Sequence, residues 1–379
     1  MNAIMASPRG ARLAPKVREM KLDDYIQVAG LQARNGLPAR AQEDWTALWR
    51  ENPTYRGLAS LWPLGWVLET SGGQVVGSVA NIPLSYRLDA KALLAATASS
   101  WVVDSQYRAY SMQLFHAFVR QGGVDLFICT SVSPSAEPVL NALHFRRVPA
   151  GNWSEVSFWI TNYRGFVESA LRSKSIPLAA LLSHPAAAVL YCRDKLRRPR
   201  LSVNNAAHDI EMSAGFDSRF DIFWEQLCRQ NAGSLLAVRT RETLEWHFRS
   251  PLSRKTAWVV TIGRNGRLIA YAIVDRHDNV ALGLRRITVL DFQAVSTFAE
   301  VLHSLVSWLL IKSRREGIHV LEVSGGWLDL SSRSRVCAPY RRTLPSWTYY
   351  YKAASASLSE ALRKPAAWAP SPFDGDASL

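Results

Sequence analysis

The sequence predicts an α/β protein with two tandem domains, each built on a mixed sheet. Three observations lead to this fold class. The chain has 379 residues, which is enough for two ordinary domains. Hydrophobic residues make up 48% of it, a content typical of chains with packed cores. A pattern of helices, hairpin, strand, long helix and strand occurs twice, which indicates duplication of one architecture.

The first half begins with short helices and a β-meander. Residues 17–31 run from a short strand into a helix, and a second short helix ends before Pro53. Two β-prone runs, 65–70 and 74–82, are separated by Ser-Gly-Gly, which predicts a hairpin. Another strand is expected over 94–103 because β-branched and small residues dominate there.

The rest of the chain is arranged around residues 101–148, which read strand, basic turn, helix, strand and helix. The turn after Val103 contains Arg108, and an apolar helix follows to Gln121. A helix start leaves backbone N–H groups unpaired and carries partial positive charge. A strand that enters a helix through a basic turn is therefore a place to hold a phosphate.

A strand over 155–160 is expected to close the first domain, which spans 1–165. The next segment, 166–205, is predicted to be a helical, basic linker. Pro185 and polar neighbours interrupt its apolar runs, so it falls short of the ~18 apolar residues of a membrane-spanning helix. Two interpretations remain open: a linker helix packed between domains, or peripheral membrane contact through 176–200.

The second half, 206–355, repeats the plan of the first. An Asn-Gly turn between two β-prone runs predicts a hairpin at 256–274, and a long amphipathic helix is expected over 295–315. Strands are expected over 286–292, 318–323 and 348–352. The tail, 356–379, is rich in Ala, Ser and Pro and is predicted to be disordered.

Charge and cysteine content bound the choice of partner and compartment. The 45 basic and 31 acidic residues give a net charge of +14, which favours an anionic partner. Candidates are a CoA-type cofactor, an acidic acyl carrier protein, an anionic lipid surface and nucleic acid. The four cysteines form no CxxC pair, so neither a metal site nor a disulfide framework is expected. Residues 1–16 lack the apolar run of a signal peptide, so a cytoplasmic location is expected. Peripheral contact at the inner membrane face is the alternative that the basic segment 176–200 leaves open.

At residues 101–148 the chain resembles the GNAT superfamily of acyl-CoA N-acyltransferases. The match rests on Val103, Tyr107, Arg108 and the helix from Ser111, in the order of the family's phosphate-binding loop. A later Leu-His-Phe at 143–145 matches the family's Leu-Gly-Phe. The resemblance covers about 17–160 and, more weakly, 206–352, and it implies two tandem GNAT-like domains.

This sequence departs from the family at several glycines. Ser111 and Gln113 stand where the loop has glycine, His144 replaces the glycine of the later motif, and Ser105 replaces a proline. Glycine lets phosphate oxygens approach the backbone without a Cβ between them. The turn of the second half has neither glycine nor arginine, so the second domain is predicted to be a degenerate copy.

The resemblance implies an acyl-CoA or acetyl-CoA donor, a small-molecule acceptor and no metal. An acyl carrier protein is an alternative donor, and a nucleic-acid partner is not expected. The acyl group would pass to an amine or hydroxyl of a sugar, an amino acid or a small metabolite. The predicted cofactor-binding residues are Trp101, Val102, Val103, Arg108, Ala109, Tyr110, Ser111 and Met112.

Glu69 and Asp104 are the acidic residues nearest the predicted cleft and are the candidate catalytic bases. No nucleophile–base pair of the triad type is readable, which disfavours a covalent hydrolase. Two rival hypotheses are kept. One is a Fem-like aminoacyl transferase that uses aminoacyl-tRNA, and the other is a non-catalytic, degenerate GNAT scaffold.

Overall fold

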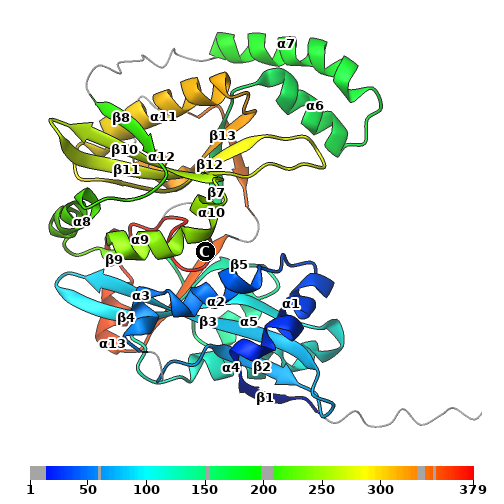
Figure 1. Ribbon diagram of the computed structural model, residues 1–379, viewed down its shortest axis with the longest axis vertical. Helices are drawn as coiled ribbons and strands as arrows, with labels where there is room; N and C mark the ends of the chain where they lie inside the picture. Colours follow the sequence, from blue (N-terminus) through cyan, green and yellow to red (C-terminus); the bar gives the residue numbers. More distant parts are fainter. Residues whose placement is uncertain (1–13, 59–60, 151–153, 198–207, 331–337, 345–346) are drawn as a thin grey trace, which may run out of the picture. The chain divides into compact units, whose positions relative to one another are not determined.

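The computed structural model describes residues 14–58, 61–150, 154–197, 208–330, 338–344 and 347–379 (Figure 1). The chain divides into two compact units. Unit 1 comprises Met1–Leu84 and Leu94–Phe127, and unit 2 comprises Ser85–Leu93 and Ile128–Leu379. These limits differ from the predicted domains 1–165 and 206–355, because the chain after Phe127 clusters with the second half.

The first sheet has the strand order β1-β2-β3-β4-β5-β15-β6. Its strands are β1 Lys16–Glu19, β2 Gly65–Glu69, β3 Val75–Leu88, β4 Lys91–Val103, β5 Leu126–Val132, β15 Thr348–Ala353 and β6 Arg146–Arg147. β2 and β3 pair antiparallel, and the turn between them holds Gly73 in the left-handed region at φ +77°. This pairing confirms the predicted Gly-Gly hairpin. Glycine suits the turn because it carries no Cβ to oppose the left-handed conformation.

Tryptophan and asparagine side chains tie the helices of unit 1 to β3. These helices are α1 Tyr25–Arg34, α2 Gln42–Arg50, α3 Pro53–Arg56 and α4 Ser111–Val119. The Asn52 carboxamide accepts from the first amides of α3 and donates to the Pro83 carbonyl. The indoles of Trp49 and Trp62 both donate to the Asn81 carbonyl. These buried bonds hold α2, the start of α3 and Trp62 against β3, because an unpaired polar group in the core would destabilise the fold.

The second sheet, read from its opposite edge, repeats the order of the first: β8-β10-β11-β12-β13-β7-β14. Its strands are β8 Asp209–Ser213, β10 Ala257–Arg264, β11 Arg267–Arg276, β12 Arg286–Ala294, β13 Val320–Ser324, β7 Glu155–Ile160 and β14 Tyr340–Thr343. β12 therefore corresponds to β4 and β13 to β5. The duplicated architecture is confirmed.

Two strands lie in the sheet opposite to the predicted one. β7, predicted to close the first domain, pairs antiparallel with β13 and β14 in the second sheet. β15, predicted as the last strand of the second domain, takes the matching place in the first sheet. The alternation of side chains identifies a strand but not its partner strand. The apolar residues of β7 or of β15 could be buried equally well in the first sheet or in the second.

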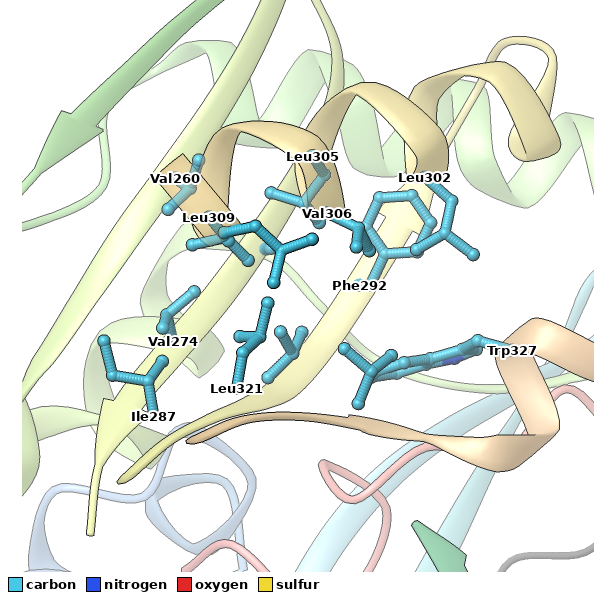
Figure 2. Close-up of a cluster of buried hydrophobic side chains, with 14 of the residues drawn as sticks. Val260, Val274, Ile287, Phe292, Leu302, Leu305, Val306, Leu309, Leu321 and Trp327 are labelled. Atoms are coloured by element: carbon cyan, nitrogen blue, oxygen red, sulfur yellow. The ribbon is translucent and has the colours of Figure 1, made fainter. Parts of the chain in front are cut away.

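Helix α11 provides the main cover of the second sheet. The long helix predicted there is confirmed over Phe298–Arg315, and Gly317 follows it at φ +65°. Figure 2 shows side chains from α11 meeting those from the strands: Leu302, Leu305, Val306 and Leu309 with Val260, Val274, Ile287 and Leu321. All of them are buried, as the 3.6-residue periodicity of the helix requires.

The other helices of unit 2 are short, apart from α6, α7 and α8. They are α5 Glu137–Ala142, α6 Tyr163–Ser173, α7 Ala179–Arg197, α8 Arg219–Gln230, α9 Arg241–His247, α10 Arg249–Ser253, α12 Gly325–Leu330 and α13 Ala356–Ala361. A short strand, β9 (Leu235–Ala237), pairs with the end of β3. The helical character of the predicted linker is confirmed in α6 and α7, and its last residues, 198–205, lie outside the described part.

The prediction that 356–379 is disordered is wrong. Ser355 caps α13, and the chain beyond it buries the large apolar side chains of Leu358, Leu362, Trp368 and Phe373. The Ala, Ser and Pro content of the segment predicted disorder, and its large apolar residues are spaced too irregularly to show the periodicity of a helix or a strand.

Candidate functional site

A backbone irregularity lies three residues before the end of β4. Ser100 has a φ of +51°, a left-handed conformation that is rare for a residue with a Cβ and rarer within a strand. The next residue, Trp101, places its ring 4.4 Å from that of Phe115 on α4. Its indole Nε1 is buried and has no hydrogen-bond partner among the described residues. Such outliers concentrate at functional sites.

The end of β4 is held to β3 and to α1. The Asp104 amide donates to the Val76 carbonyl over 2.9 Å. Its carboxylate accepts from the Arg34 guanidinium at 2.8 Å and from the Asn35 amide at 2.8 Å. Burial would raise the pKa of Asp104, but these hydrogen bonds outweigh it and hold the pKa below the ordinary value. Asp104 is therefore ionised at neutral pH and is a weak base.

Glu69, the second candidate base, is also occupied by an arginine. Both of its carboxylate oxygens accept from Arg18, at 2.9 and 3.0 Å, and Arg18 binds Asp24 as well. The hydrogen bonds from Arg18 lower the pKa of Glu69. Glu69 pairs with Val75 in register, and Asp104 lies on the far side of β3 from it. Both carboxylates thus lie at the same end of the strands, Glu69 paired with an arginine that it shares with Asp24 and Asp104 paired with Arg34.

The predicted phosphate turn is a 3-10 helix, η3, over Ser105–Tyr110, which runs directly into α4. Arg108 is exposed and forms no ion pair with a described residue, and Met112 is exposed beside it. The Ser111 amide donates to the Arg108 carbonyl, so one amide predicted to hold a phosphate is engaged within the turn. No side chain caps the start of α4.

Trp101 to Met112 form one continuous segment, whereas Glu69 is separated from it by β3. Gln113, which replaces a family glycine, is exposed. His144, which replaces another, has a φ of +60°. The structure thus keeps at His144 the left-handed conformation that a glycine adopts without strain.

In unit 2 the strand equivalent to β4 leads to a buried ion cluster. Arg239 donates to Asp291 of β12 at 2.9 Å, and both side chains are almost fully buried. Arg239 also meets Asp374 and the Ser371 hydroxyl. Sequence reasoning missed this cluster because its members are up to 135 residues apart and carry no local pattern. No group of His, Cys, Asp or Glu in the described ranges is arranged to bind a metal ion.

No protein-family model matches the sequence, and no curated protein shows significant sequence similarity to it. Solved structures do match. A GCN5-related N-acetyltransferase from Anabaena variabilis superposes with a TM-score of 0.52 at 10% identity, over 90% of this chain and 73% of that one. A probable N-acyltransferase from Enterococcus faecalis gives 0.55 at 12%, over 89% and 72%.

N-myristoyltransferase from Saccharomyces cerevisiae, solved with bound myristoyl-CoA, gives a TM-score of 0.53 at 11% identity, over 92% of this chain and 81% of that one. The fold is that of the GNAT acyltransferases. A GNAT fold alone does not fix a reaction, so function has to be argued from the site that this chain builds on it.

Proposed function

We propose that this protein is a GNAT-type acyltransferase that uses an acyl-CoA donor, bound in unit 1 by the end of β4, η3 and the start of α4. The observation that carries the proposal is the left-handed Ser100 within β4, directly before Trp101 and five residues before η3, the turn that holds the exposed Arg108. The left-handed residue distorts the strand at this point, and a backbone N–H turned out of the regular pairing there would polarise a thioester carbonyl.

The proposed roles follow the order of the chain. Amides of Trp101–Val103 would donate to the thioester carbonyl. Arg108 would contact the donor's phosphates, without first breaking an ion pair to any residue in the described ranges. The start of α4 would face the same anion. On donor binding, the Ser111 amide would stop donating to the Arg108 carbonyl and would donate to a phosphate oxygen instead. This change is confined to one turn of the backbone.

An amine or hydroxyl acceptor must lose a proton before it attacks the thioester. Glu69 and Asp104 are ionised, but their arginine partners make them weak acceptors of that proton. We propose that either becomes an effective base only when the substrate draws its arginine away. The pH dependence of the turnover rate, measured with an amine acceptor and with a hydroxyl acceptor, would then show which acceptor class the enzyme uses.

Isothermal titration with CoA, acetyl-CoA and myristoyl-CoA tests the donor site. We expect Arg108→Ala to weaken donor binding by about tenfold, the loss of one charge-assisted contact. Arg120→Ala is the matched control, since Arg120 is exposed just after the other end of α4. Absence of binding for all three compounds, or equal affinity in Arg108→Ala, would overturn the proposal.

A second candidate is a non-catalytic scaffold. It is favoured by the engaged Ser111 amide and by the arginine pairs on both carboxylates. An acyl-transfer assay with a panel of amines and alcohols separates the two candidates. Donor binding without turnover for any acceptor, and without release of CoA, would support the scaffold.

A further inference from the structure

Helix α7 buries mainly small and polar side chains and exposes most of its large aliphatic ones. Its inward positions recur every three to four residues and hold one half-buried leucine, Leu190, among small or polar side chains that are buried: Ala179, Ser183, Ala187 and Asp194. Helix α6 packs along α7, and Figure 1 shows the two as an antiparallel pair at the margin of unit 2. A surface helix normally buries its large aliphatic residues instead.

The other large aliphatic residues of α7, and Leu178 just before it, are exposed. Positions spaced four and three residues apart form one stripe, all of it exposed: Leu178, Leu182, Pro185, Val189, Cys192 and Leu196. Leu178 and Val189 are each 71% exposed and Leu196 is 88% exposed, and Leu181 lies beside the stripe. Scattered exposed leucines are ordinary, but a continuous stripe along one helix marks an interaction surface.

Charge on α7 is equally one-sided. Its only acidic residue, Asp194, is buried and accepts hydrogen bonds from the hydroxyls of Tyr163 and Tyr340. Lys195 is exposed next to the stripe, and Lys174 is exposed just before α7 begins. Arg193 is also exposed, although it donates to the Tyr340 hydroxyl and lies 3.6 Å from Asp194. The outer surface of the helix therefore combines aliphatic side chains with positive charge only.

We propose that this outer stripe of α7 is an interfacial anchor that lies on an anionic membrane surface. An amphipathic helix with a basic border inserts its apolar side chains at the level of the lipid headgroups. Cations beside it are attracted by the surface potential of anionic lipid, and the whole chain carries +14. In the described residues no helix is both long and apolar enough to cross a bilayer, which fits a helix that lies on the surface.

A second copy of this chain is the competing occupant, because the stripe has coiled-coil spacing. Charge disfavours it, since two copies would bring together helices that expose cations and no acidic side chain. Anionic lipid offers both the apolar interior and the opposite charge.

Vesicle flotation of the full chain tests the proposal, with vesicles of phosphatidylcholine alone and of phosphatidylcholine mixed with phosphatidylglycerol. We expect the wild type to float with the mixed vesicles. A variant with Leu178→Ser, Val189→Ser and Leu196→Ser should lose binding by tenfold or more. The control carries Ile26→Ser, Ile222→Ser and Val280→Ser, three equally exposed aliphatic residues outside α7, and should float like the wild type.

A third variant, with Lys174→Gln and Lys195→Gln, should bind severalfold more weakly and lose part of its salt dependence. Light scattering after size exclusion gives the oligomeric state of each variant. Three results would overturn the proposal: no flotation of the wild type, equal flotation of the stripe variant, or a wild-type dimer that the stripe variant dissociates. Donor binding is measured on the same variants and is expected to stay unchanged, so failure of the anchor is distinct from failure of the acyltransferase proposal.

Discussion

Strands β4 and β12 occupy equivalent places in the two sheets, and each is irregular a few residues before its end. In β4 the irregularity is the left-handed Ser100, and in β12 it is a register shift opposite Ile273 and Val274. The charged residues near the two irregularities differ. After β4 comes a turn with the exposed Arg108, whereas on β12 the charge is the buried Asp291, paired with Arg239.

The same backbone arrangement therefore carries an exposed charge in unit 1 and a buried ion pair in unit 2. In unit 1 the turn leaves a cation available to solvent, where an anionic ligand can bind it. In unit 2 the corresponding strand is fixed by a buried cluster that holds the segment around Ser371 and Asp374. A buried arginine whose hydrogen bonds are all made within the protein strongly destabilises the fold when it is removed. An exposed arginine contributes little to the free energy of unfolding.

The largest effect is expected at Arg239. Arg239→Ala leaves the Asp291 carboxylate buried without its charged partner, and this should lower the free energy of unfolding by about 3–5 kcal/mol. Urea denaturation followed by circular dichroism measures the change. Arg120→Ala serves as control, and a loss below about 1 kcal/mol at Arg239 would contradict the role of the cluster.

Asp374 should make the stability of unit 2 depend on pH. Burial, which outweighs the opposing effect of Arg239, raises the pKa of Asp374 from 3.8 to about 6. A carboxyl with a raised folded-state pKa stabilises the fold at low pH, and that contribution is lost as pH rises from about 4 to about 6. Relative to Asp374→Asn, the wild type should therefore lose on the order of 1–3 kcal/mol across this range. Parallel pH curves for the two proteins would rule this out.

A smaller effect is expected at Asp104. Asp104→Asn weakens the contact with Arg34 at the end of β4 and should lower the free energy of unfolding by about 1 kcal/mol near pH 7. Because the pKa of Asp104 is lowered by folding, its contribution is present above the ordinary pKa and is lost as pH falls through the folded-state value. The difference between variant and wild type should thus shrink in acid, and a constant difference would contradict this.

The smallest effect on stability is expected at Arg108. Its exposed side chain forms no ion pair with a described residue, so Arg108→Ala should change the free energy of unfolding by less than about 0.5 kcal/mol. The same substitution is expected to weaken donor binding, and the contrast with Arg239→Ala is the sharpest form of the comparison. A destabilisation of several kcal/mol would show that Arg108 is a structural residue.

Local patterns were sufficient for most elements. The Gly-Gly hairpin, the strand–turn–helix at β4 and the apolar stripe of α11 all follow from residues close together in sequence. Partner choice was not readable in this way. The exchange of β7 and β15 depends on pairing between segments far apart in the chain, and so do the arginines that occupy Glu69 and Asp104. The left-handed Ser100 carries no sequence signal, because serine does not demand that conformation, whereas the left-handed His144 stands where the resembled family has a glycine.

The exchange of β7 and β15 also sets the order in which the protein can fold during synthesis. β6, the antiparallel partner of β15, leaves the ribosome roughly 200 residues before it, and Tyr350 must later align with Arg147. At typical rates of elongation this delay is roughly 10–40 s. Until then strand edges stay unpaired, and β7 in turn waits for β13. Neither half can complete its sheet from its own strands, so unpaired strand edges persist in the nascent chain until β13 and β15 have been made.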